Sequence, residues 1–151
     1  MSYRFHAPQH QLLTIVARLM AAVLTFVLWP AALAQPAEAD GARRAVDGWL
    51  QKLDAGRYEA TWTDAAAMFQ KGVPADTWQK AIREVREPLG PLQQRSETSA
   101  QATKLLPGVP DGNYLVLTYR SSFANKAFAT ETVAAVQETD GSWKVAGYFL
   151  K

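Results

Sequence analysis

The spacing of apolar residues changes from a helical period to an alternating period near Pro91, and this change constrains the fold most strongly. Before Pro91, apolar residues recur every three or four positions, as on one side of an α-helix. After it, apolar and polar residues alternate, as in strands with one buried face. A run of helices followed by a run of strands predicts an α+β fold with an antiparallel sheet.

The helical part divides into three predicted helices. The first covers residues 42–53 and ends near Gly56, a residue typical of helix ends. The second covers residues 58–69, and the third begins at Asp76 and ends before Pro88. We expect residues 35–41 to be a flexible lead.

The alternating part predicts four strands, over residues 93–106, 115–123, 127–138 and 142–150. Asp140 and Gly141 predict a tight hairpin before the last strand, and Gly147 within that strand predicts a bend or a close approach. We therefore expect three N-terminal helices packed on a curved four-stranded antiparallel sheet, in a single domain at residues 42–151.

The N-terminal segment has the pattern of an export signal. Arg4 and Arg18 precede an apolar run over residues 19–29, and the small-x-small pattern of residues 32–34 follows. We predict a signal peptide at residues 1–34, cleavage after Ala34 and a periplasmic or secreted mature protein. The alternative is an uncleaved anchor, although an apolar stretch this short falls below the roughly 20 residues of a spanning helix.

Cleavage would leave a chain without histidine or cysteine, because His6 and His10 lie in the signal and no cysteine is present. Imidazole and thiol chemistry are then excluded, and the scattered carboxylates predict no metal site. The remaining 14 basic and 14 acidic residues balance, which argues against nucleic-acid binding. We assign no catalytic residue and no cofactor. Ser121 and Ser122 are interpreted as loop residues, and Asp54 as part of a solvated helix face.

Arg86 and Glu131 are the most informative charged residues. Arg86 continues the apolar stripe of the third helix, and Glu131 lies in a strand of small and apolar residues. Because charges are rarely buried alone, each needs a partner. One interpretation is an ion pair that ties the helix to the sheet; the other is a polar cleft in which Arg86 recognises an anion.

Four aromatic residues extend that candidate ligand site between helices and sheet. Most aromatic positions fall on apolar stripes and are interpreted as core. A pocket there would instead be lined by aromatic rings and a few polar groups, and its candidate residues are Trp62, Trp78, Tyr119 and Tyr148.

The chain resembles a family of small exported bacterial proteins known as DUF4019, a domain of unknown function. The resemblance covers residues 42–150 and rests on Trp49-Leu50, Asp54 to Tyr58, Trp62, Trp78, Arg86 to Gly90, Arg95, Leu106 to Gly108, Gly112 to Tyr114, Phe123, Glu131 and Asp140 to Tyr148. It implies one domain without an assigned activity. The order of elements is also similar to cystatin-like and nuclear-transport-factor-2-like domains, which host many functions.

Three functions remain open at this point. The first is a non-enzymatic module that binds an unidentified small molecule or protein. The second is an enzyme with a cone-shaped pocket, in which Glu131 acts together with Tyr119 or Tyr148. The third is a structural domain that forms a homodimer through the sheet face bearing Tyr114, Val116 and Thr118.

Overall fold

The computed structural model describes residues 36–151, so the predicted signal peptide and its cleavage site lie outside the described residues. The helices come first: α2 (Pro36–Asp54), α3 (Tyr58–Thr63), α4 (Ala67–Gly72) and α5 (Ala75–Arg86), followed by the short 3-10 helix η1 (Glu87–Leu89). Four strands follow: β1 (Leu92–Thr103), β2 (Tyr114–Phe123), β3 (Lys126–Gln137) and β4 (Trp143–Leu150). The α+β class is therefore confirmed.

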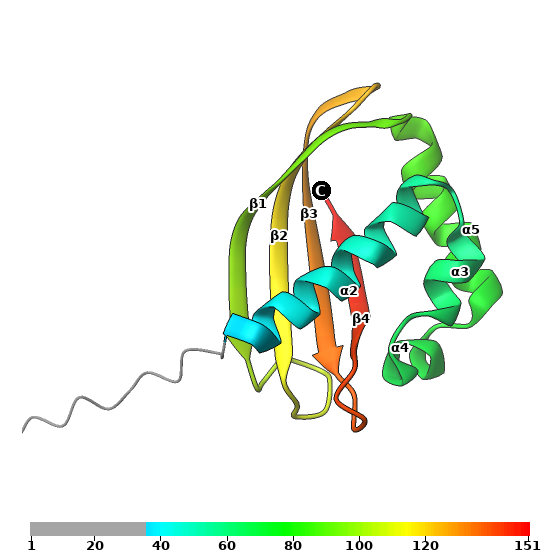
Figure 1. Ribbon diagram of the computed structural model, residues 1–151. Coiled ribbons are helices and arrows are strands. Elements are labelled where there is room, and N and C mark those ends of the chain that lie inside the picture. Colours follow the sequence, from blue (N-terminus) through cyan, green and yellow to red (C-terminus); the bar gives the residue numbers. More distant parts are fainter. Residues whose placement is uncertain (1–35) are drawn as a thin grey trace, which may run out of the picture. The chain divides into compact units, whose positions relative to one another are not determined.

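The strands form one antiparallel sheet in the order β1-β2-β3-β4, as expected for hairpin-connected neighbours. Figure 1 shows α2 lying across one face of this sheet, with α3, α4 and α5 gathered beyond β4. The core between α2 and the sheet contains Val46, Leu53, Leu117 and Val133, each nearly or fully buried. The change of hydrophobic period near Pro91 is thus the boundary between the helices and the sheet.

The helices differ from the prediction in two ways. The first helix begins at Pro36, so residues 36–41 continue α2 and do not form the expected flexible lead. Ala39 packs against the core and Ala42 is fully buried, which gives these residues a tertiary reason to be helical. A surface helix whose apolar side is covered gains most of its stability from that packing.

The second predicted helix is interrupted, so residues 36–151 contain four α-helices and not three. Residues 64–66 separate α3 from α4. Within this break, the backbone N–H of Ala66 donates to the carbonyl of Val145 in β4 at 2.8 Å. Because that N–H bonds to the sheet, a continuous helix over residues 58–69 does not form.

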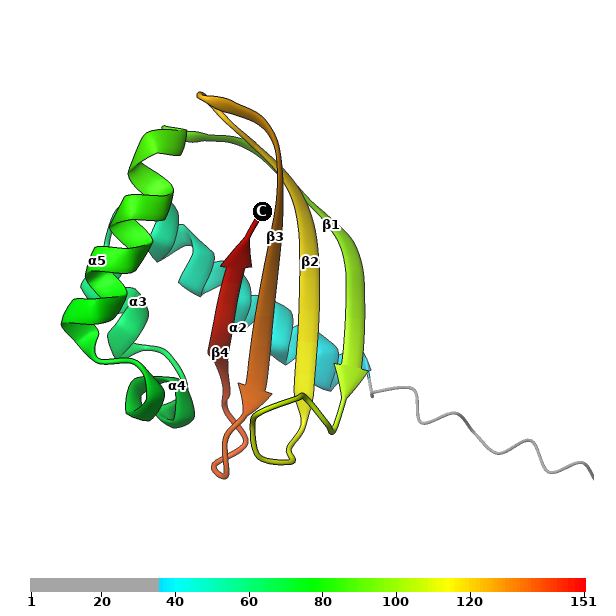
Figure 2. The same ribbon diagram turned by 180° about the vertical axis from the view of Figure 1, so that it is seen from behind.

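The opposite side of the sheet is called the outer face here. Residues paired across neighbouring strands share a face, and the pairing places Ser96, Arg120 and Thr130 in one row. Figure 2 views this side, with β1, β2 and β3 in front of α2. The outer-face positions are Gln94, Ser96, Ser99, Gln101 and Thr103 of β1, Tyr114, Val116, Thr118, Arg120 and Ser122 of β2, Phe128, Thr130, Thr132, Ala134 and Val136 of β3, and Lys144 and Phe149 of β4.

The last strand contains an irregularity beside Gly147. Gly147 pairs with Ala134, but the next pair joins Val145 to Ala135, so Ala146 is an extra residue. Such a bulge bends the strand locally. The bend predicted from Gly147 is therefore present, but it lies at the neighbouring residue. None of the helices in residues 36–151 is long and apolar enough to cross a membrane.

Candidate functional site

Four charged side chains meet where the helices join the sheet, and together they form the charge cluster: Asp54, Arg86, Arg95 and Glu131. Asp54 and Arg86 are the last residues of α2 and α5, whereas Arg95 and Glu131 lie on β1 and β3. The cluster contains two cations and two anions, so it is neutral. It ties two helix ends to two strands that are separated by β2.

Glu131 lies at the centre of the cluster and is fully buried. Its Oε1 accepts hydrogen bonds from Nε of Arg95 at 2.7 Å and from Oγ of Ser121. Its Oε2 accepts from Nη1 of Arg86 at 3.2 Å, Nη2 of Arg95 at 3.1 Å and the hydroxyl of Tyr148 at 2.7 Å. A carboxylate offers about four lone-pair positions. The five donors therefore occupy its acceptor capacity.

Arg86 fills the space between the helices and the sheet and is only 5 % exposed. Its Nη2 donates to Oδ1 of Asp54 at 2.5 Å, and its Nη1 also donates to the Tyr148 hydroxyl at 3.1 Å. Its guanidinium carbon lies 4.6 Å from the centre of the Phe123 ring, a cation–π contact. Of the two interpretations that the sequence left open for Arg86 and Glu131, the ion pair is present, with additional partners.

Arg95 closes the cluster from the edge of the sheet. It donates through Nη1 to Oδ2 of Asp54 at 2.7 Å and through Nη2 to Oδ1 at 3.0 Å, in addition to its bonds to Glu131. Such a bidentate pair is among the stronger charge-assisted arrangements. The side chain of Asp54 is 22 % exposed and that of Arg95 is 13 % exposed, so the cluster meets solvent at this pair.

The pKa shifts in the cluster keep Glu131 ionised and Tyr148 neutral. Burial raises the pKa of Glu131, but the hydrogen bonds from Arg95 and Ser121 and the charge of Arg95 outweigh it, and the pKa is lowered. Burial, followed by the charge of Glu131, raises the pKa of Tyr148. Glu131 is then an anion that accepts donors and Tyr148 a neutral phenol that donates. This arrangement holds protons in place and offers no free base.

The other three proposed site residues are not members of the cluster, although Tyr119 is the cross-strand partner of Glu131. Trp62 Nε1 donates to the carbonyl of Val73 at 2.7 Å, and Trp78 Nε1 donates to Oγ1 of Thr61 at 2.9 Å. Tyr119 is buried on β2, and burial raises its pKa. The structure thus brings Arg86, Glu131 and Tyr148 together. It places Tyr119 beside Glu131 on the neighbouring strand, as its cross-strand partner, and Trp62 and Trp78 elsewhere.

Sequence reasoning missed three members of this arrangement. Asp54 was interpreted as part of a solvated helix face, and Ser121 as a loop residue, but Ser121 lies within β2. Arg95 was noticed only within the family resemblance. Arg95 shares a face with Glu97, two positions along β1, and the structure shows Glu97 bonded to Arg43 of α2 on the helix side. The polar sequence around Arg95 carries no signal for this orientation.

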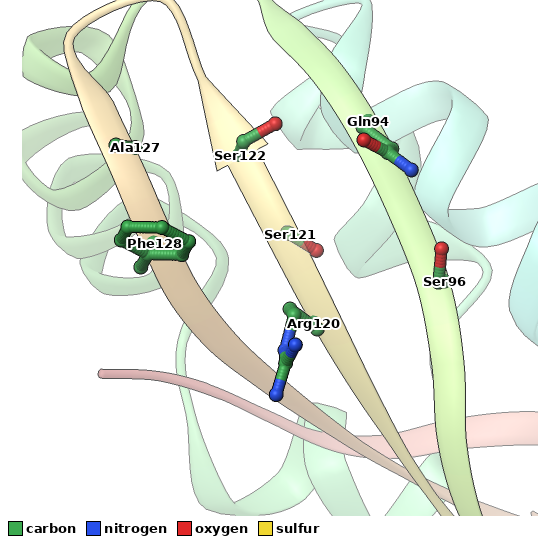
Figure 3. Close-up of a pocket in the computed structure, with 7 residues that line it drawn as sticks. All are labelled: Gln94, Ser96, Arg120, Ser121, Ser122, Ala127 and Phe128. Atoms are coloured by element: carbon green, nitrogen blue, oxygen red, sulfur yellow. The ribbon is translucent and has the colours of Figure 1, made fainter.

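A shallow depression of about 280 Å³ lies on the outer face above the cluster. Figure 3 shows its lining residues on three neighbouring strands: Gln94, Ser96, Arg120, Ser121, Ser122, Ala127 and Phe128. Arg120 is exposed, and among residues 36–151 its side chain has no hydrogen-bond or ion-pair partner. The described residues contain no group of histidine, cysteine or acidic side chains able to hold a metal.

The fold and the cluster define a small α+β domain in which helices pack on one side of an open antiparallel sheet. A similar fold occurs in a protein from Catenulispora acidiphila whose structure is known at 2.5 Å. The similarity has a TM-score of 0.51 and 14 % sequence identity, and it covers 78 % of this chain and 92 % of the other. At this identity the likeness concerns the fold alone.

The chain belongs to the family described as protein of unknown function (DUF4019), whose model matches residues 45–148. The resemblance inferred from the sequence is therefore confirmed, and the match spans nearly all of the described domain. No curated protein matches the sequence. The function must accordingly be argued from the chemistry of the domain itself.

Proposed function

We propose that this protein is an exported, non-enzymatic binding module that recognises another protein through the outer face of its sheet. The observation that carries the proposal is the exposure of two large aromatic side chains on that face. Phe128 is 78 % exposed and Phe149 is 65 % exposed. Aromatic residues and arginine are enriched at the centres of protein interfaces, and Arg120 lies near Phe128 in the same depression.

The surroundings of these residues also support binding. The outer face is otherwise composed of small polar and aliphatic side chains, including Ser96, Thr118 and Thr132. Such a surface is easily dehydrated, because it offers few ions that would need strong hydration. An extended, half-apolar face with exposed rings is typical of an interaction surface.

The state of Glu131 favours binding over catalysis. An enzyme of the cone-pocket type would need Glu131 to face an open cavity and to accept a proton from a substrate. Glu131 is fully buried and its oxygens accept hydrogen bonds from four side chains of the domain. A general base must lie within hydrogen-bond reach of the substrate proton. The charge cluster supports a structural role instead.

Export is the second part of the proposal and rests on the N-terminal signal pattern. We infer cleavage after Ala34 and delivery to the periplasm or the exterior. Intact-mass measurement of the protein isolated from the exported fraction of its source organism tests this. A mass that still includes residues 1–34 would contradict the inferred cleavage.

Site-specific photo-crosslinking tests the proposed surface. A photoreactive phenylalanine analogue replaces Phe149 in one variant and Phe128 in another, and each full-length variant is expressed in the source organism. The control variant carries the analogue at Lys80, which is exposed on α5. We expect the two outer-face positions to crosslink to the same protein and the control position not to do so. Absence of any crosslink from Phe128 and Phe149 would refute the proposed function.

A further inference from the structure

We propose that the partner presents an extended acidic segment and that Arg120 binds its carboxylate. This inference rests on the proposed function and names the chemistry of the partner. The relevant segment carries an aspartate or glutamate flanked on the same side by apolar residues. The argument depends on the charges of the outer face, the size of the depression and the spacing of Phe128 and Phe149.

The first observation is the distribution of charge on the sheet. The four strands contain two carboxylates, Glu97 and Glu131, and both bond to arginines on the helix side. The outer-face positions carry two cations, Arg120 and Lys144, and no carboxylate. Across the predicted mature chain the two signs balance. The outer face is therefore locally positive, and the side chain of Arg120 has no partner within residues 36–151.

The second observation is the kind of donor around Arg120. Ser96, Ser122 and Gln94 line the same depression and can each donate a hydrogen bond. Arginine presents a planar fork that matches a carboxylate. The depression thus offers a guanidinium together with hydroxyl and amide donors and no acid, a set of groups suited to an anionic side chain. The lining therefore favours a carboxylate over a cation.

The third observation is size. The depression measures about 280 Å³ and is open, whereas pockets for small molecules usually enclose roughly 300–1,000 Å³. Most of a small ligand would remain in solvent here. One side chain of a larger partner fits better, because the rest of that partner contacts the surrounding sheet. The volume therefore favours a protein segment over a free organic acid.

The fourth observation is the spacing along the sheet. Thr130 pairs with Arg120, and Thr132 pairs with Phe149, so Arg120 lies level with a point between the two rings. Phe128 lies four residues before Thr132, which places the rings roughly 14 Å apart at ordinary strand spacings. Same-side residues of an extended peptide repeat every ~7 Å. A segment with apolar residues at positions one and five and an acid at position three matches this pattern.

The charge cluster gives this surface a rigid base. Arg95, Ser121 and Glu131 lie on the helix side of the same three strands, directly behind Ser96, Arg120 and Thr130. Their hydrogen bonds hold β1, β2 and β3 in register beneath the depression. Binding then requires little ordering of the sheet, and preorganisation reduces the entropic cost of association.

A second copy of this chain is a poorer occupant. A two-fold symmetric contact between two outer faces would use the same patch on both copies. Each copy would then contribute Arg120 and no outer-face carboxylate to the contact. Like charges without a counter-charge disfavour such an interface. The charge pattern thus argues for a different protein with an acidic surface.

Charge reversal at Arg120 tests the inference while the photoreactive group at Phe149 reports binding. Arg120→Glu should reduce the crosslink at least fivefold, which corresponds to about 1 kcal/mol, whereas Arg120→Lys should retain more than half of it. Arg57→Glu is the matched control, because Arg57 is also exposed and its side chain has no partner within residues 36–151. Thermal unfolding should be the same for all three variants. Mass spectrometry of the crosslinked peptide should find an aspartate or glutamate within two residues of the crosslink.

The outcomes separate this inference from the proposed function. A crosslink that persists in Arg120→Glu would leave the outer face as the binding surface and overturn the acidic partner. A crosslinked species with twice the mass of the chain would overturn it in favour of a homodimer. Absence of every crosslink would refute the proposed function and the inference with it.

Discussion

Removal of the negative charge of Glu131 should destabilise the domain more than any surface substitution. In Glu131→Gln the shape of the side chain is retained, but Arg86 and Arg95 keep only Asp54 as an acidic partner within the cluster. The cluster then carries one uncompensated positive charge, and Arg86 is only 5 % exposed. Breaking a buried pair in this way costs about 3–5 kcal/mol. For a domain of this size, that corresponds to a fall in Tm of roughly 10–20 °C.

The assay is a double-mutant cycle followed by urea denaturation. Arg86→Met alone leaves an excess negative charge, with Glu131 and Asp54 sharing Arg95. The double variant leaves Arg95 and Asp54 as a neutral pair. The double variant should therefore be more stable than the sum of the single losses predicts, by about 1–3 kcal/mol. Tryptophan fluorescence follows unfolding, because Trp49 and Trp78 lie in the core.

The exposed pair of Lys52 and Asp64 provides the control. Its side chains are 33 % and 45 % exposed, and such surface pairs typically contribute 0–1 kcal/mol. A cycle at this pair should give a small coupling. If the cycle at Arg86 and Glu131 also gave additive losses below about 1 kcal/mol, the structural role assigned to the cluster would be refuted.

Three further predictions concern the pH dependence, a buried hydroxyl and two glycines. The pKa of Glu131 is lowered in the folded state, so the unfolded state binds more protons in acid. The stability that Glu131 contributes should therefore be lost as the pH falls below about 4.5 and through the folded-state pKa. Urea denaturation midpoints measured from pH 7 to pH 3 should fall less steeply in Glu131→Gln than in the unsubstituted protein. Thr61→Val removes the acceptor of the Trp78 Nε1–H and should lower the free energy of unfolding by about 1–3 kcal/mol in a urea titration. The control Thr63→Val, on the exposed side of α3, should change the free energy of unfolding by less than about 0.5 kcal/mol. Gly90→Ala should lower Tm, because Gly90 has φ +72° and a Cβ there would lie 3.1 Å from the Cβ of Ala124. Gly147→Ala should leave Tm nearly unchanged, because its Cβ would contact only the Phe149 ring, at 3.5 Å. Calorimetric Tm values that rank the two variants in the opposite order would contradict this reasoning.

The prediction for Gly147 differs from what the sequence suggested. A glycine within a strand indicates a bend or a close approach, and the sequence cannot distinguish these. The bulge at Ala146 accounts for the bend, and the space beside Gly147 is not tight. The sequence therefore predicted an irregularity at Gly147, one residue away from Ala146, which forms the bulge.

The candidate site was predictable only in part. Arg86 and Glu131 stood out because each charge occupied an apolar pattern, and a buried charge needs a partner. Asp54 and Arg95 lie on polar stretches, so nothing local marked them as members of the cluster. Their contact depends on how the end of α2 meets the edge strand β1, which is a property of packing.

Of the outer face, the sequence predicted only the part that belongs to β2. Alternation along β2 identified Val116 and Thr118 as members of one face, because side chains alternate across a sheet. Most aromatic positions were interpreted as core, but the rings of Phe128 and Phe149 are exposed. Phe128 lies on the face of Thr130 and Thr132, and the bulge at Ala146 places Phe149 on that face and Val145 on the other.

The amino-acid sequence by itself determined the class of the fold, the approximate positions of the four strands and the need of Arg86 and Glu131 for charged or polar partners. Each of these follows from local periodicity or from the high cost of an unpaired buried charge. The tertiary structure decided the break between α3 and α4, the four-membered composition of the charge cluster and the exposure of the outer face. These depend on contacts between distant segments, such as the hydrogen bond from Ala66 to Val145. Such contacts exist only once helices and sheet have packed, because no local pattern specifies the distance between them.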